Sequence, residues 1–88
     1  MRSVEVQILG QSYSIKTDED DAYIKALARY VDEKLKEIYS AAPNVSQAKA
    51  SVMAAFGIAD ELFKLRVQQE DIDRMIEEKT RMLSVLID

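Results

Sequence analysis

The fold is decided by the stretch from Ser46 to Ile87, SQAKASVMAAFGIADELFKLRVQQEDIDRMIEEKTRMLSVLI. It contains no proline and one glycine, Gly57, and its apolar residues recur three and four positions apart. This spacing predicts one uninterrupted helix. At 1.5 Å per residue such a helix is roughly 60 Å long.

The same stretch follows a heptad pattern. The a positions are Ala55, Leu62, Gln69, Ile76 and Leu83, and the d positions are Ile58, Leu65, Ile72, Lys79 and Leu86. Most of these positions are apolar, which predicts a coiled coil. Because so short a chain cannot cover so long a helix by itself, we expect self-association through a heptad seam that consists of Ile58, Leu62, Leu65, Ile72, Ile76, Leu83 and Leu86.

The composition excludes several kinds of chemistry. The 88 residues include no cysteine and no histidine, so disulfides, thiolate chemistry and histidine-based catalysis are impossible. No glycine-rich phosphate loop or nucleophile–base pair is present, and we predict neither an enzyme nor a metal or cofactor site. A net charge of −4 argues against nucleic acid as a partner. The N-terminus lacks the apolar run of a signal peptide and no segment has membrane-spanning length, so we expect a soluble cytoplasmic protein.

Residues 4–16 alternate between apolar and polar side chains, which predicts a β-hairpin. Gly10 and Gln11 are expected to form a two-residue turn with glycine in the first central position. That turn would pair Ile8 with Tyr13, Val6 with Ile15 and Glu5 with Lys16.

A first helix is predicted from about residue 18 to residue 40. Thr17 is expected to cap it, with Asp20 at the third helical position and four acids, 18–21, at the positive end of the helix dipole. Pro43 ends this helix, and Asn44 or Ser46 is expected to cap the next one. The predicted buried residues of the first helix are Ile24, Leu27, Ala28, Val31, Leu35 and Ile38, with Tyr23 and Tyr30 at their margin.

The opposite face of this helix carries Lys25, Arg29, Asp32 and Lys36 within a narrow arc. A solvated helix face accounts for such a set, and so does a cationic docking surface for an acidic partner. We call Lys25, Arg29 and Lys36 the basic stripe.

Together these segments predict a mostly α-helical α+β chain. A head, residues 1–45, contains the hairpin and the first helix, and residues 46–88 form the coiled-coil helix. Two functions fit: a cross-linker with several heads joined by a rod, and a small dimeric DNA-binding regulator of the strand–helix–helix type. The second fits less well, because the first strand carries Val4, Glu5 and Gln7 rather than a basic set.

The stretches VEVQILGQSYSI, YVDEKLKEI and ASVMAAFGIADELFKL resemble the ZapA family of bacterial cell-division proteins. The resemblance covers essentially the whole chain. It implies a dimer through the long helix, and two dimers joined into an antiparallel homotetramer with heads at both ends. It also implies that the heads bind FtsZ and bundle its filaments at the Z ring, at mid-cell. The family's hairpin turn often carries a basic residue implicated in FtsZ contact, and the matching position here is Gln11.

Overall fold

The computed structural model describes the backbone of residues 1–87 and the side chains of residues 1–81. The elements follow the order β1 (Arg2–Ile8), β2 (Gln11–Thr17), α1 (Asp21–Ala41) and α2 (Gln47–Ile87). The predicted fold class is confirmed: a two-stranded antiparallel hairpin precedes two helices of 21 and 41 residues. The chain divides into two compact units, Met1–Gly57 and the residues from Ile58 onward, and each is described by itself.

The hairpin exists as predicted, but its predicted turn and register are wrong. Leu9 and Gly10 form the turn, and both have positive φ, at 52° and 77°. Positive φ at both central residues is the requirement of a type I′ turn, whose twist matches that of the strands. Val6 therefore lies opposite Tyr13, Val4 opposite Ile15, and Glu5 opposite Ser14 rather than Lys16.

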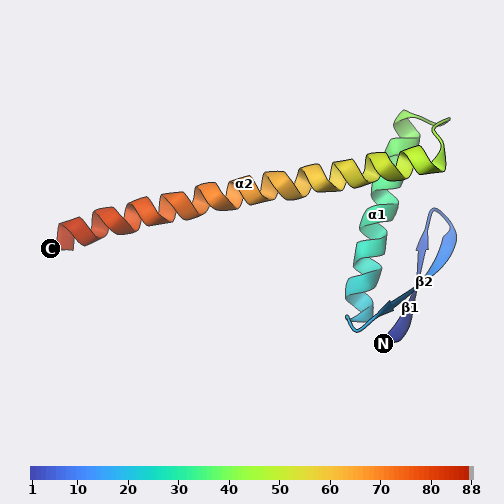
Figure 1. Cartoon of the computed structure of the whole chain (residues 1–88), viewed down its shortest axis with the longest axis horizontal. Helices are drawn as coiled ribbons and strands as arrows, with labels where there is room; N and C mark the ends of the chain where they lie inside the picture. Colours follow the sequence, from blue (N-terminus) through green and yellow to red (C-terminus); the bar gives the residue numbers. More distant parts are fainter. Residues whose placement is uncertain (88) are drawn as a thin grey trace. The chain divides into compact units, whose positions relative to one another are not determined.

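The shift in register by two residues leaves the two faces of the hairpin unchanged, because side chains alternate with a period of two. Val4 and Val6 remain on one face, where both are buried against Ile24 and Ala28 of α1. Figure 1 shows α1 lying along the hairpin. The core of the head is therefore the contact between β1 and α1.

The start of α1 differs from the prediction. Asp20 occupies the N-cap position without a side-chain hydrogen bond, and the helix begins at Asp21 rather than at residue 18. Thr17 ends β2, and its hydroxyl accepts a hydrogen bond from the Glu19 amide at 3.0 Å. Arg2 on β1 donates to the Glu19 carbonyl and lies 3.0 Å from the Asp21 carboxylate. These contacts hold residues 18–20 in a non-helical conformation, so the helix begins only at Asp21.

The predicted buried face of α1 is largely confirmed. Ile24, Ala28 and Leu35 are buried, whereas Leu27 is 46% exposed. Tyr23 and Tyr30 are also exposed. The hairpin and the first turns of α2 leave these three side chains uncovered.

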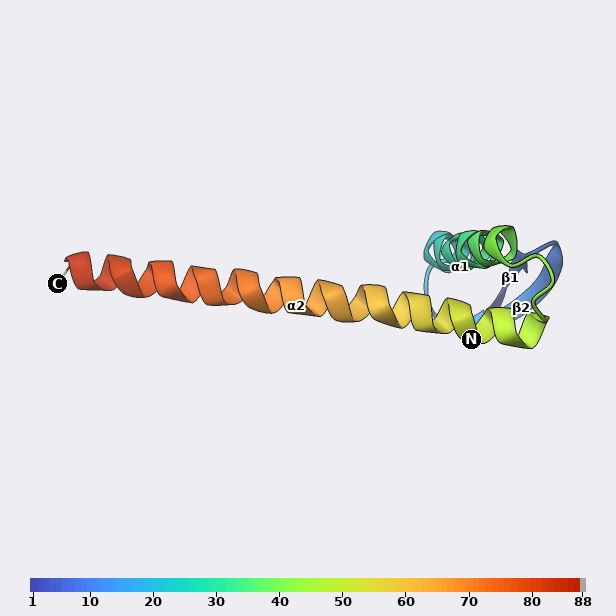
Figure 2. The ribbon, with the colours of Figure 1, turned by 90° about the horizontal axis from the view of Figure 1, so that it is seen from above.

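The first turns of α2 complete the first unit. Ser46 is the cap, because its hydroxyl accepts a hydrogen bond from the Lys49 amide at 3.2 Å. Ala50 and Ala54 are buried against Leu35. Figure 2 shows α1 and the first turns of α2 from above. The first residues of α2 thus share a core with α1. The boundary between head and coiled-coil helix after residue 45 stays a prediction.

Candidate functional site

The basic stripe lies on α1, and the structure divides it into two parts. Lys25 and Arg29, one helical turn apart, line a groove of about 270 Å³. The other lining residues are Glu5, Val6, Gln7, Ala28 and Asp32. Two acids therefore share this groove with two cations, so the groove has mixed charge.

Lys36 is engaged in an ion pair. Its Nζ lies 2.9 Å from a carboxylate oxygen of Asp32, one turn earlier on α1. The hydrogen bond and the charge of Asp32 raise the pKa of Lys36. In the described part of the chain no ion pair involves Lys25 or Arg29, which makes these two the available cations of the stripe.

Asp32 connects the stripe to the hairpin turn. Its carboxylate accepts a hydrogen bond from the backbone amide of Leu9 at 2.8 Å. This bond is the main cause of a lowered pKa of Asp32, and the bond from Lys36 is the second. Asp32 was predicted to lie on the same helix face, with no role of its own. An acid among three cations was the signal that could have found it.

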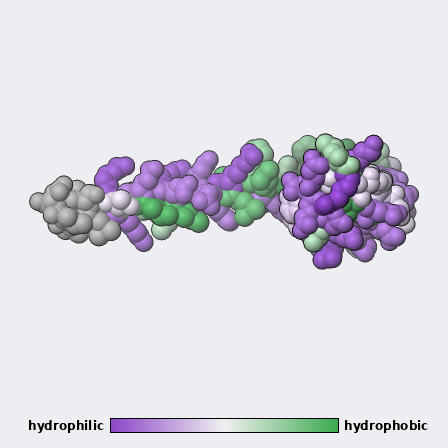
Figure 3. All heavy atoms as spheres, turned by 90° about the horizontal axis from the view of Figure 1, so that it is seen from below, coloured by the Kyte–Doolittle hydropathy of each residue, from purple (hydrophilic) through white to green (hydrophobic). Residues whose placement is uncertain are grey.

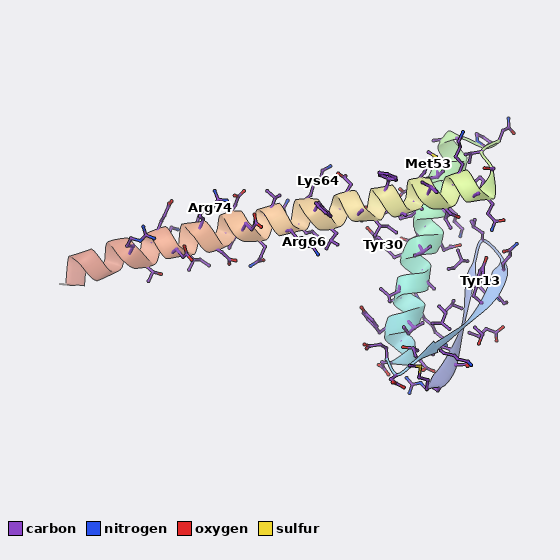
Figure 4. The ribbon with its side chains drawn as sticks, viewed as in Figure 1. Tyr13, Tyr30, Met53, Lys64, Arg66 and Arg74 are labelled. Atoms are coloured by element: carbon purple, nitrogen blue, oxygen red, sulfur yellow. The ribbon has the colours of Figure 1, made fainter. Side chains whose placement is uncertain are left out.

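Gln11 begins β2, immediately after the turn, and pairs with Ile8. Its side-chain oxygen accepts a hydrogen bond from the Tyr13 hydroxyl at 2.8 Å. Figure 4 shows Tyr13 extending from β2. Because the Leu9 amide is hydrogen-bonded to Asp32, the turn that precedes Gln11 is held against α1 near Lys36.

The heptad seam is exposed in the single chain. Leu62, Leu65, Ile72 and Ile76 are between 46% and 62% exposed, and Ile58 is half-buried. Figure 3 shows hydrophobic residues along α2 between hydrophilic ones. The seam residues Leu83 and Leu86 lie outside the described side chains. Large apolar side chains at this exposure are typical of a surface that another molecule covers.

The described residues hold neither a metal-binding cluster nor a membrane-spanning helix. No group of three or more histidine, cysteine, aspartate or glutamate side chains is placed to hold a metal ion among them. None of the helices searched in this part of the chain is long and apolar enough to cross a membrane.

Comparisons with known proteins agree with this architecture. A ZapA protein of Shouchella clausii is 37% identical over 65 residues, which cover 74% of this chain and 83% of that protein. A ZapA protein of Bacillus mycoides is 28% identical over 76 residues, covering 86% and 85%. A solved structure described as an unknown conserved bacterial protein from Pseudomonas aeruginosa PAO1 covers all of this chain and 98% of its own, with a TM-score of 0.79 and 29% identity.

The family assignment follows from a match over nearly the whole chain. The family model described as cell division protein ZapA matches residues 4–87, which include the hairpin and both helices. The chain belongs to the ZapA family of cell division proteins.

Proposed function

We propose that this protein is a non-enzymatic cross-linker that binds FtsZ and bundles its filaments at the Z ring. The observation that carries the proposal is the exposed heptad seam of α2 in a chain of the ZapA family. When α2 helices pair through this seam, the heads of two or more chains are joined in one particle. Several heads joined in one particle convert weak single contacts into strong overall binding.

In the proposed assembly, two α2 helices pair in parallel through the seam. Two such dimers then join into an antiparallel homotetramer with heads at both ends. The half-exposed side chains of Leu62, Leu65, Ile72 and Ile76 support this arrangement, because pairing removes their apolar surface from water. Its place of action would be the cytoplasmic division site at mid-cell.

The proposed FtsZ contact is the head surface that carries Lys25, Arg29 and Lys36, together with Gln11 at the hairpin. Lys25 and Arg29 would carry most of the charge interaction, since Lys36 is already paired with Asp32. Dissolved salt screens the attraction between exposed charges, and the screening length is about 10 Å at 0.1 M ionic strength. Binding to FtsZ should therefore decline as the salt concentration rises.

The test is the double variant Lys25→Glu/Arg29→Glu in co-sedimentation with FtsZ polymers. We expect loss of FtsZ binding with an unchanged oligomer by sedimentation equilibrium. The matched control is Lys49→Glu/Arg74→Glu, which reverses two exposed charges on α2 outside the heptad seam and its flanking positions. Full binding by the α1 variant would place the FtsZ contact on another surface.

The alternative of a strand–helix–helix DNA-binding regulator has no support in the comparisons, because the matching family and the relatives named above are cell division proteins. We do not propose it.

A further inference from the structure

An apolar groove of about 390 Å³ lies in the first unit. It is formed by the hairpin, by α1 and by the first turns of α2. Six of its lining side chains are apolar or aromatic, and the polar ones are small or neutral: Ile8, Leu9, Tyr13, Ile15, Val31 and Leu35, with Ser14, Gln47 and Ser51. It is distinct from the mixed-charge groove that Lys25 and Arg29 line.

The groove is open because α1 covers only the β1 side of the hairpin. Tyr13 and Ile15 lie directly opposite Val6 and Val4, so all four side chains share one face of the hairpin. The helix α1 covers the β1 half, where Val4 and Val6 are only 3% and 4% exposed. On the β2 half, Tyr13 and Ile15 remain 42% and 38% exposed. The apolar face of the hairpin is thus buried on its β1 side and exposed on its β2 side.

The uncovered half adjoins the expected dimer interface. Ser51 and Gln47, which line the groove, belong to the first turns of α2. Extending the heptads backward from Ile58 places Ser51 at a d position and Gln47 at a g position. The groove therefore opens at the N-terminal continuation of the heptad seam. A second helix that follows the seam in parallel passes beside it.

The heptad numbering also identifies the residue that arrives there. In a parallel pair, a g residue lies beside the e residue five positions later in the partner helix. The neighbour of Gln47 is then Val52 of the second copy. Positions e of coiled coils are often charged, but Val52 is apolar and 57% exposed in the single chain. Its size and chemistry suit a groove bordered by Tyr13 and Ile15.

We infer that a second copy of this chain completes the head, with Val52 of each chain seated in the apolar groove of the other. The inference rests on the proposed parallel dimer and adds a contact outside the seam. Each chain both offers Val52 and supplies a groove, as a two-fold symmetric interface requires. The Tyr13 hydroxyl bonds to Gln11, so covering Tyr13 also fixes the side chain beside the hairpin turn. The surface offered to FtsZ is then complete only in the dimer.

The test uses thiol cross-linking, because the chain has no cysteine of its own. An Ile15→Cys chain labelled with ¹⁵N is refolded together with an unlabelled Val52→Cys chain and treated with a short bismaleimide. Mass spectrometry then distinguishes the mixed cross-link from those between identical chains. In the matched control, Lys49→Cys replaces Val52→Cys on a face of α2 that points away from the groove. Tyr13→Cys replaces Ile15→Cys in a parallel experiment, since Tyr13 lies on the same face of the hairpin and lines the same groove.

We expect a mixed cross-link from Val52→Cys to Ile15→Cys and to Tyr13→Cys, and only background from Lys49→Cys. A separate Ile58→Cys chain reports on the parallel seam, where identical d residues meet. If Ile58→Cys cross-links to itself but Val52→Cys yields no more mixed product than Lys49→Cys, the groove contact is refuted and the proposed dimer stands. If Ile58→Cys also fails, the parallel dimer and the inference are both refuted.

Discussion

The carboxylate of Asp32 on α1 accepts a hydrogen bond from the backbone amide of Leu9, in the turn of the hairpin, over 2.8 Å. The same carboxylate holds Lys36 at 2.9 Å. Leu9 has a φ of 52°, a conformation that leucine rarely adopts. Asp32 thus stabilises an unusual turn and ties the hairpin to the helix that carries the basic stripe.

Replacing Asp32 by asparagine should destabilise the protein in a pH-dependent way. Folding lowers the pKa of Asp32, so the ionised form stabilises the folded state. This contribution is complete above the ordinary aspartate pKa, about 3.9, and is lost as the pH falls through the lowered value. Asp32→Asn should melt below the wild type at pH 7, and the difference should shrink in acid.

Thermal unfolding followed by circular dichroism at a series of pH values measures this difference. Glu37→Gln, an exposed acid on the same helix, is the control and should match the wild type throughout. A difference for Asp32→Asn that stays constant down to the acid range would show that the charge of Asp32 contributes nothing.

The two glycines should respond oppositely to alanine. Gly10 has a φ of 77°, so Gly10→Ala should destabilise the chain by roughly 1–2 kcal/mol through backbone strain, although space for a Cβ is available. Gly57 lies within a helix with open space around it, so Gly57→Ala should stabilise by up to about 1 kcal/mol. Urea unfolding of both variants measures the two effects. A destabilised Gly57→Ala would indicate that another copy approaches the backbone closely at this position.

The heptad seam should not tolerate a charge. Ile76→Glu places a carboxylate where an apolar side chain is expected to be buried, at a cost of about 2 kcal/mol or more per copy. Sedimentation equilibrium should show loss of the largest species. Arg74→Glu, at an f position on the same turn, changes the charge outside the seam and should leave the assembly intact. An unchanged tetramer for Ile76→Glu would exclude this residue from the tetramer interface.

Periodicity made α2 and its exposed seam predictable. The recurrence of Ile58, Leu62, Leu65, Ile72 and Ile76 fixes both a helix and one face of it, and the four described residues from Leu62 to Ile76 are exposed as a self-associating surface should be. Strand alternation likewise predicted the hairpin, but it could not choose between registers two residues apart, since both bury the same face. In the observed register the Leu9 amide of the turn donates a hydrogen bond to Asp32, 23 positions away in sequence, a contact that strand alternation does not encode.

The candidate site was predictable only as a set of residues on one helix face. Lys25, Arg29 and Lys36 do share that face, and the i,i+4 spacing of Asp32 and Lys36 permits their ion pair. The sequence does not show that Glu5 on β1 borders the same groove as Lys25. Local spacing places residues on a face of their own helix. Contacts with another element depend on packing between distant segments, which the spacing does not encode.

Low-speed sedimentation of FtsZ polymers is the most direct test of the proposed cross-linking. Single filaments remain in the supernatant at low speed, whereas bundles pellet. We expect the wild-type protein to carry FtsZ into the low-speed pellet, and Ile76→Glu to bind filaments at high speed without bundling them. If the wild-type protein, at concentrations where it is tetrameric, leaves FtsZ in the low-speed supernatant, the protein does not cross-link FtsZ filaments and the account is wrong.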